Sequence, residues 1–160
     1  EFLVALIQQS GMRFARTDVI EVVTNEQTTA GKKTLWKTLK SINQEGCVFK
    51  RLDAPYQAGR FDTQVKCKFW TSGTFIVLKQ NADHRSVELG ALDSNGVVQS
   101  VGSCTVPTNH ALPAVDALVE VRYLYAVESL VQPIYLGERD DIQREECTIA
   151  QLKFKQGSQE

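Results

Sequence analysis

Residues 45–69 read EGCVFKRLDAPYQAGRFDTQVKCKF, and this stretch decides the fold that the sequence predicts. The segments 46–52 and 64–69 are rich in residues that favour β-structure. The connection between them, residues 53–63, contains a proline and a glycine and is typical of a turn-rich loop. The pattern therefore predicts two strands joined by an irregular connection.

Lysines recur on these two predicted strands. Because side chains alternate along a strand, Lys66 and Lys68 share one face, and Lys50 points away from the side of Cys47 and Phe49. Two ammonium groups on one face of a buried strand are costly unless an anion meets them. A phosphate group is the natural candidate, since the ammonium group is a compact charge suited to it.

A carboxylate precedes the first of the two strands. Glu45 would complement the lysines by holding a divalent metal ion, because hard cations prefer oxygen ligands. The alternative interpretation is a pair of amphipathic edge strands whose lysines are simply solvated.

Helical signals come before this stretch. Residues 2–10 are typical of the end of a helix, and residues 19–23 form a short β-rich run. A second helix is predicted up to Asn43, with Thr28 or Thr29 as its N-cap. Three lysines lie together on one face of that helix, which is most simply a solvated surface: Lys33, Lys37 and Lys40.

Short β-runs separated by turn signals follow the stretch. Residues 94–96 (SNG) are typical of a hairpin turn, and a helical turn fits between residues 109 and 116. Such a series suggests a small closed barrel, and the OB-fold is the commonest barrel of this kind. The predicted strands are 75–79, 86–92, 97–104, 118–125, 130–136 and 147–154.

The charge is unevenly divided along the chain. Of the 160 residues, 42% are hydrophobic and the net charge is −1, as in a soluble globular protein. Residues 1–68 carry 11 Lys+Arg and 7 Asp+Glu, a balance of +4, while residues 69–160 carry 7 and 12, a balance of −5. A basic part of a chain indicates a face for polyanions, and a chance distribution of solvated charges is the alternative.

The cysteines argue against a zinc site and against secretion. No two of them form a CxxC pair, and the two histidines stand alone in the sequence. No secretory signal precedes them, so we expect reduced thiols and a cytoplasmic location. The four are Cys47, Cys67, Cys104 and Cys147.

Two segments resemble sequence motifs of the covalent nucleotidyltransferases. EGCVFK (45–50) is similar to motif IV (EGxxxK), and KCK (66–68) is similar to motif V (KxK), of ATP-dependent DNA ligases. The phrases HRSVELGALD, VEVRYLYA and QPIYLGERDDI resemble later blocks of bacterial-type ligases, in the same order. The resemblance runs from about residue 18 to residue 154.

The resemblance implies roles for residues on the two strands. Glu45 matches the glutamate that acts with the catalytic metal ion, Mg²⁺. Lys50 closes motif IV and would approach the nucleotide phosphate. Lys66 and Lys68 match the motif V lysines, which neutralise the α-phosphate during adenylyl transfer. Arg60, in the connection, would contact polyphosphate or DNA phosphate.

A further match and a mismatch lie in the predicted barrel. Arg139 and Asp141 fall where motif VI (RxDK) belongs, and they would bind nucleotide or DNA phosphate and help to orient the pyrophosphate leaving group. Ile142 replaces the lysine of that motif. This difference puts the contribution of the barrel to adenylation in doubt.

The lysine nucleophile of the family is absent from this sequence. Ligases attach AMP from ATP to the lysine of a KxDG motif, and no KxDG occurs in the 160 residues. The resemblance therefore implies the C-terminal part of a ligase: an α+β remnant of the nucleotidyltransferase (adenylation) domain at 1–68 and a five-stranded Greek-key OB-fold domain at 69–160. The expected partners are nicked duplex DNA and an N-terminal ligase half that carries the KxDG lysine.

Other interpretations stay open. The chain can be a non-catalytic OB-fold DNA-binding module derived from a ligase, with Arg85 and Arg122 as candidate DNA contacts in an otherwise acidic domain. It can also be an excised piece, one half of a split enzyme, or the product of a decayed gene. We expect that the chain alone does not form the enzyme–AMP intermediate.

Overall fold

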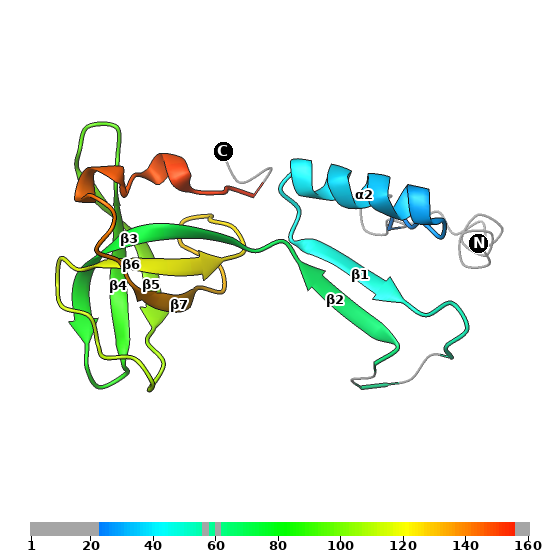
Figure 1. Ribbon diagram of the computed structural model, residues 1–160, viewed down its shortest axis with the longest axis horizontal. Coiled ribbons are helices and arrows are strands. Elements are labelled where there is room, and N and C mark those ends of the chain that lie inside the picture. The colour runs from blue at the N-terminus through cyan, green and yellow to red at the C-terminus, as the bar shows by residue number, and fades with distance from the viewer. Residues whose placement is uncertain (1–22, 56–57, 60–61, 156–160) are drawn as a thin grey trace, which may run out of the picture. The chain divides into compact units, whose positions relative to one another are not determined.

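The computed structural model describes residues 23–155 except 56–57 and 60–61 (Figure 1). Its internal contacts divide the chain into two compact units, Glu1–Leu35 and Trp36–Glu160. None of the described helices is long and apolar enough to cross a membrane. Three predictions lie outside the described residues: the helix end at 2–10, the strand at 19–23 apart from Val23, and the phosphate-binding role of Arg60.

The helix α2 (Thr29–Ser41) confirms the helix predicted before the two strands. Thr28 is its N-cap, because the Thr28 hydroxyl accepts a hydrogen bond from the Gly31 N–H at 3.0 Å. The helix ends two residues earlier than predicted. Asn43 then adopts a left-handed backbone conformation with φ 53°, as is common just past a helix C-terminus.

A two-stranded antiparallel hairpin follows α2. It consists of β1 (Gly46–Lys50) and β2 (Gln64–Lys68), which confirms both strands predicted from the opening stretch. The aromatic ring of Trp36 packs edge-on against Phe69, with 4.7 Å between ring centroids, and lies 6.1 Å from the ring of Phe49. Trp36 is therefore a packing residue.

The second part of the chain forms a five-stranded antiparallel sheet in the order β5-β4-β3-β6-β7. The sheet curls so that its edge strands β5 and β7 contact each other (Figure 1). The Leu130 N–H also donates to the Val101 carbonyl of β5 at 2.9 Å, near this junction. The strands are β3 (Thr71–Asn81), β4 (Ser86–Leu92), β5 (Val98–Thr105), β6 (Leu118–Tyr123) and β7 (Ile134–Glu138).

Alternating side chains of these strands fill the inside of the curled sheet. Phe75 and Tyr123 meet edge to face at 5.9 Å between ring centroids, which is a favourable aromatic geometry. Burial of apolar side chains of this kind is the main force that holds such a domain together. The core also includes Val77, Val87, Leu89, Ala91, Val101, Cys104, Val106, Val119, Val121, Ala126, Leu130 and Tyr135.

The predicted hairpin turn at 94–96 is confirmed. It joins β4 to β5, and its Gly96 has φ 76°, a conformation that glycine adopts without steric cost. The Asp93 carboxylate accepts hydrogen bonds from the N–H groups of Val97 at 2.9 Å and Asn95 at 2.8 Å. These bonds lower the pKa of Asp93, since they favour its charged form.

Three predictions for the residues after the hairpin are wrong, two in the kind of element and one in where a strand starts. Residues 147–154 form no continuous strand and contain a short 3-10 helix, η2 (Ile149–Gln151), with Ile149, Leu152 and Phe154 packed on the core. These side chains reach the core at spacings of three and two residues, so the apolar residues of this segment do not by themselves indicate a strand. Residues 109–116 contain turns and no helix. The strand predicted at 130–136 starts only at Ile134, directly after Pro133.

Candidate functional site

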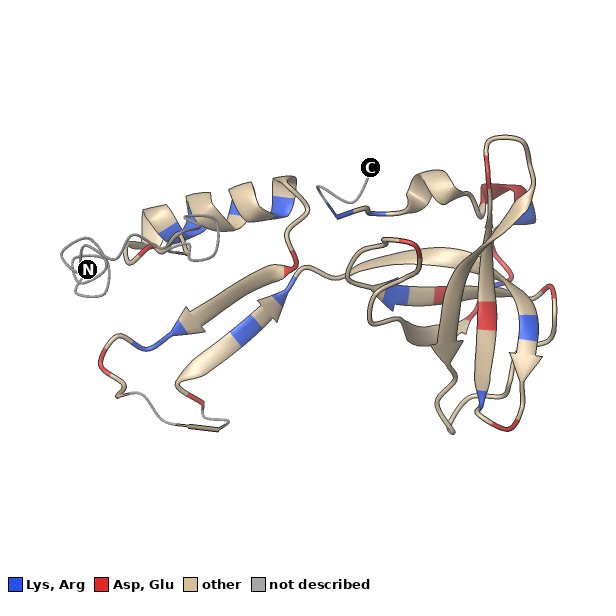
Figure 2. Cartoon of the chain, turned by 180° about the vertical axis from the view of Figure 1, so that it is seen from behind, with Lys and Arg blue, Asp and Glu red and all other residues tan. Residues whose placement is uncertain are grey.

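The hairpin register places three lysines on one face. Directly opposite residues of an antiparallel pair project from the same face, and Lys66 lies opposite Val48. Lys50 comes two residues after Val48 on β1, opposite Gln64, so it projects from the same face as Lys66. Lys68, two residues from Lys66 on the same strand, shares that face as predicted. We call Lys50, Lys66 and Lys68 the lysine face. Figure 2 shows basic residues on both strands.

The three lysines differ in their exposure and in the partners of their ammonium groups. Lys50 and Lys66 are exposed, whereas Lys68 is half-buried. The Lys68 ammonium donates a hydrogen bond to the Gln132 side-chain oxygen at 2.5 Å and lies 3.9 Å from the Glu45 carboxylate. Lys50 and Lys66 are therefore the lysines whose charge is open to an incoming anion.

Trp70 lies under two cations. The Lys68 ammonium is 5.5 Å from the centroid of the Trp70 ring, and the Arg122 guanidinium is 5.2 Å from it. Cation–π contacts of this kind are worth about 0.5–1 kcal/mol at exposed sites. Arg122, a candidate DNA contact in the sequence, thus stacks on Trp70 at the start of the sheet.

Arg85, the other candidate DNA contact, binds the chain's own backbone. Its guanidinium donates to the carbonyl oxygens of Pro107 at 3.2 Å and His110 at 2.7 Å. Arg85 itself has φ 45°, a backbone conformation that few residues other than glycine adopt. Arg85 therefore fixes the loop between β5 and β6.

Glu45 lies at the start of β1, where it can meet a cation. Its side chain is 52% exposed. Among the residues that the structure describes, no three or more His, Cys, Asp or Glu side chains gather around a potential metal site. Magnesium is commonly held by one or two carboxylates, water and substrate phosphates, so a single exposed carboxylate beside a lysine face fits that donor set.

Gly46 lets the two strands approach closely next to Glu45. A Cβ atom on Gly46 would lie 2.1 Å from the Cys67 carbonyl oxygen and 2.9 Å from the Lys68 Cα. A side chain at this position would push β2 away. The glycine of the EGxxxK pattern thus has a packing role that the sequence alone did not indicate.

Arg139 and Asp141 form a second group, which follows β7. The Arg139 guanidinium donates two hydrogen bonds to the Asp141 carboxylate, at 2.8 and 2.5 Å, and a third to the Thr74 hydroxyl at 3.3 Å. The paired guanidinium lowers the pKa of Asp141, and the same hydrogen bonds raise the pKa of Arg139. Arg139 thus has an acidic partner within the chain.

Sequence reasoning missed Gln132. This residue has φ 54° and precedes Pro133, and its side-chain oxygen accepts the bond from Lys68. A Gln-Pro pair between two β-runs indicates only a turn. Contact between residues 64 positions apart leaves no local signal in a sequence.

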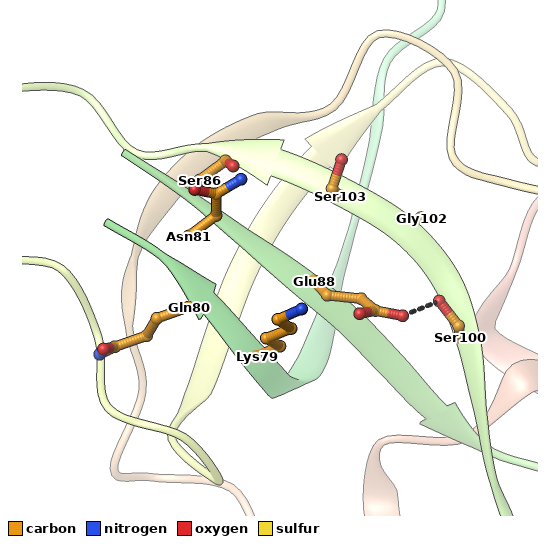
Figure 3. A pocket seen from close by; sticks show the side chains of 8 residues that line it. All are labelled: Lys79, Gln80, Asn81, Ser86, Glu88, Ser100, Gly102 and Ser103. Carbon is orange, nitrogen blue, oxygen red and sulfur yellow. Dashed lines mark hydrogen bonds between the residues drawn. The ribbon is translucent and has the colours of Figure 1, made fainter. Parts of the chain in front are cut away.

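A shallow polar hollow of about 370 Å³ lies over β3, β4 and β5. Within it, the Ser100 hydroxyl donates to the Glu88 carboxylate at 2.9 Å, as Figure 3 shows. One lysine and one glutamate leave the hollow without net charge. Its lining residues are Lys79, Gln80, Asn81, Ser86, Glu88, Ser100, Gly102 and Ser103.

Comparison with known proteins relates this fold to that of ligases. No protein-family model matches the chain, and no curated protein matches it. A solved structure described as "DNA binding with a minimal scaffold: Structure-function analysis of Lig E DNA ligases" matches with a TM-score of 0.57 and 18% identity. The match covers 72% of this chain and 48% of the other. The fold is that of part of a DNA ligase.

Two further solved structures match this ligase-like chain. One, described as "Pmar-Lig_PreS3", has a TM-score of 0.55 and 21% identity over 70% of this chain and 32% of its own. The other, a "mycobacterial DNA ligase D complexed with ATP and MES", has a TM-score of 0.40 and 24% identity over 72% of this chain and 50% of its own. The chain thus spans about half or less of each of these proteins.

Proposed function

We propose that this chain is the C-terminal part of an ATP-dependent DNA ligase. Residues 1–68 would be the end of the adenylation domain, and residues 69–160 an OB-fold domain. The strand order β5-β4-β3-β6-β7 with contact between the edge strands supports a five-stranded Greek-key barrel. The likeness of the fold to the Lig E ligase structure supports the proposal as a whole.

The observation that carries this proposal is the lysine face with Glu45 at its end. Transfer of an adenylyl group depends on neutralising charge on phosphate oxygens at fixed positions. Lys50 and Lys66 present open ammonium groups for this purpose. Lys68 is held by Gln132 and adjoins Glu45, so it would order the end of the face nearest the metal ligand.

Glu45 is the residue that would hold Mg²⁺. The bound ion would supply charge neutralisation at the phosphate groups of ATP or of the adenylated nick. In nick sealing, AMP passes from ATP to an enzyme lysine and then to the 5′-phosphate of the nick, after which the 3′-hydroxyl displaces AMP. We propose that this chain handles the phosphates, and that an N-terminal ligase half supplies the KxDG lysine.

A second candidate function is duplex DNA binding without catalysis. The open ammonium groups of Lys50 and Lys66 favour it, because holding a DNA backbone needs only such charges and no nucleophile. In this case the barrel and the lysine face would serve only to hold a DNA backbone. The expected affinity for DNA would then fall steeply with salt, as it does for any binding through phosphates.

One experiment separates the two candidates. A nick whose 5′-phosphate already carries AMP needs only the last step, attack by the 3′-hydroxyl, and this step does not use the KxDG lysine. We expect the full chain with Mg²⁺ to seal this DNA and to incorporate no radiolabel when it is given labelled ATP alone. Binding without sealing of the pre-adenylated nick would favour the non-catalytic module. If the chain neither binds nor seals this DNA, both candidates are contradicted.

Charge-removing variants test the lysine face. Lys50→Gln and Lys66→Gln should each reduce the slope of log affinity against log salt by about 0.9 on duplex DNA, as expected for one lost phosphate contact. Lys79→Gln, which removes a lysine of the polar hollow on β3, is the matched control and should leave the slope unchanged. Equal slopes for all three variants would contradict the assignment of the lysine face.

A further inference from the structure

Two cysteines face each other across the hairpin. Cys47 of β1 lies directly opposite Cys67 of β2 in the register, so both thiols project from the same face. This face lies opposite the lysine face. Both residues are partly exposed, whereas Cys104 and Cys147 are buried in the second part of the chain.

The hydrogen bonds on either side define the kind of strand pair that the two cysteines form. The Phe69 N–H donates to the Glu45 carbonyl at 2.8 Å, and the Arg51 N–H donates to the Thr63 carbonyl at 3.0 Å. Hydrogen-bonded pairs alternate with non-hydrogen-bonded pairs along an antiparallel ladder. Cys47 and Cys67 therefore form a hydrogen-bonded pair.

Such a pair meets the distance requirement of a disulfide. Its Cα atoms are typically about 5.5 Å apart, and disulfides span Cα separations of roughly 4.4–6.8 Å. Partial burial raises the pKa of Cys47, and the neighbouring Cys67 thiol raises it further. This effect is consistent with two sulfur atoms held near each other.

We propose that Cys47 and Cys67 form a reversible thiol–disulfide modification site that reacts with low-molecular-weight disulfides to give a cross-strand disulfide. The site is separate from the proposed ligase function and does not depend on it. The cross-link would join the two strands that carry the lysine face, directly beside Gly46 and Lys68.

The reaction proceeds in two balanced exchanges. The thiolate of one cysteine attacks a sulfur of the small disulfide, which forms a mixed disulfide and releases one small thiol. The thiolate of the second cysteine then attacks the protein sulfur of the mixed disulfide and displaces the second small thiol. The two cysteines are oxidised, the small disulfide is reduced, and the two protons end on the released thiols.

The cross-link should be readily reduced. Directly opposite Cβ atoms in a strand pair are separated by about 4.5–5.5 Å and are farther apart in hydrogen-bonded pairs, whereas a disulfide needs about 3.5–4.5 Å. The strands must therefore draw together on this face when the bond forms. Disulfides that are strained or exposed have more oxidising potentials and open easily.

The test uses oxidised glutathione and mass spectrometry of the full chain. With the Cys104→Ser/Cys147→Ser variant, we expect loss of both titratable thiols, a mass decrease of two hydrogens, no retained glutathione, and full reversal by dithiothreitol. Cys47→Ser should instead retain one glutathione on Cys67. These two results together identify an intramolecular bond between Cys47 and Cys67.

Other results would overturn the proposal. Persistent glutathione on both Cys47 and Cys67, retention of both free thiols, or a disulfide between two chains on a non-reducing gel would each do so. If the double serine variant does not fold, peptide mapping of the oxidised wild-type chain decides the question. A linked peptide pair containing Cys47 and Cys67 supports the site, and its absence contradicts it.

Discussion

Replacing Gly46 by alanine tests the close approach of the two strands beside the candidate site. The new Cβ would lie 2.1 Å from the Cys67 carbonyl oxygen, and real Cβ atoms essentially never come within 3.0 Å of such an atom. The strands must therefore separate there by 3.0 minus 2.1, or 0.9 Å. Forcing extra atoms into a packed position typically costs about 1–3 kcal/mol.

This cost should appear locally, in the hydrogen bond from the Phe69 N–H to the Glu45 carbonyl, which is 2.8 Å long and adjoins Gly46. Since about 1.4 kcal/mol corresponds to a factor of ten, the Phe69 amide should exchange with deuterium about 5- to 150-fold faster in Gly46→Ala than in the wild type. The assay is native-state hydrogen exchange followed by NMR.

The matched control is Val48→Ala on the same strand. The Val48 side chain is 47% exposed, so its truncation removes little packing and should leave the exchange of the Phe69 amide within about twofold of the wild type. An unchanged exchange rate in Gly46→Ala would refute the close approach. Equal acceleration in both variants would refute the claim that steric overlap at Gly46 is the cause.

Three further predictions concern the five-stranded sheet and the turn that joins β4 to β5. Tyr123→Phe should lower the free energy of unfolding by about 1–3 kcal/mol, because the Tyr123 hydroxyl accepts a hydrogen bond from the Lys153 N–H and donates one to the Gln151 carbonyl. A urea titration measures this, and an unchanged unfolding midpoint would contradict a stabilising role of these two hydrogen bonds. Asp93→Ala should lower the free energy of unfolding at neutral pH. This difference from the wild type should shrink as the pH falls below about 4 and through the lowered pKa of Asp93, because the wild-type carboxylate then becomes protonated. Unfolding curves across this pH range test the sign. Burial raises the pKa of Cys104 to about 11, so iodoacetamide should label this thiol at pH 8 only after unfolding, and rapid labelling of the native chain would contradict its burial.

Local signals explain why the hairpin and most strands of the five-stranded sheet were predictable. Two β-rich segments around a Pro/Gly connection, and the SNG turn, carry their information within a few residues. Thr28 likewise caps the helix α2 from the adjoining position. The segment 147–154 failed because its apolar side chains pack on the core from a 3-10 turn, and tertiary contacts decided its conformation.

The candidate site was predictable in part for the same reason. The shared face of Lys66 and Lys68 follows from the two-residue period of a strand, whereas the addition of Lys50 to that face needs the register between strands. The hold of Gln132 on Lys68 and the stacking of Arg122 on Trp70 join residues that are far apart in the sequence. The roles of these residues in phosphate chemistry stay predictions.

The two-sided hairpin has a consequence for how this part of the chain can vary. Slipping one strand by a single residue would move its lysines to the face of Cys47, Cys67 and Phe49, where Phe49 lies against Trp36. The side chains therefore set the pairing of the strands, and the 13-residue connection 51–63 does not have to. Doubling the length of a flexible loop costs only about 0.6 kcal/mol in closure entropy. Insertions in this connection should therefore be tolerated without moving the lysines from their shared face.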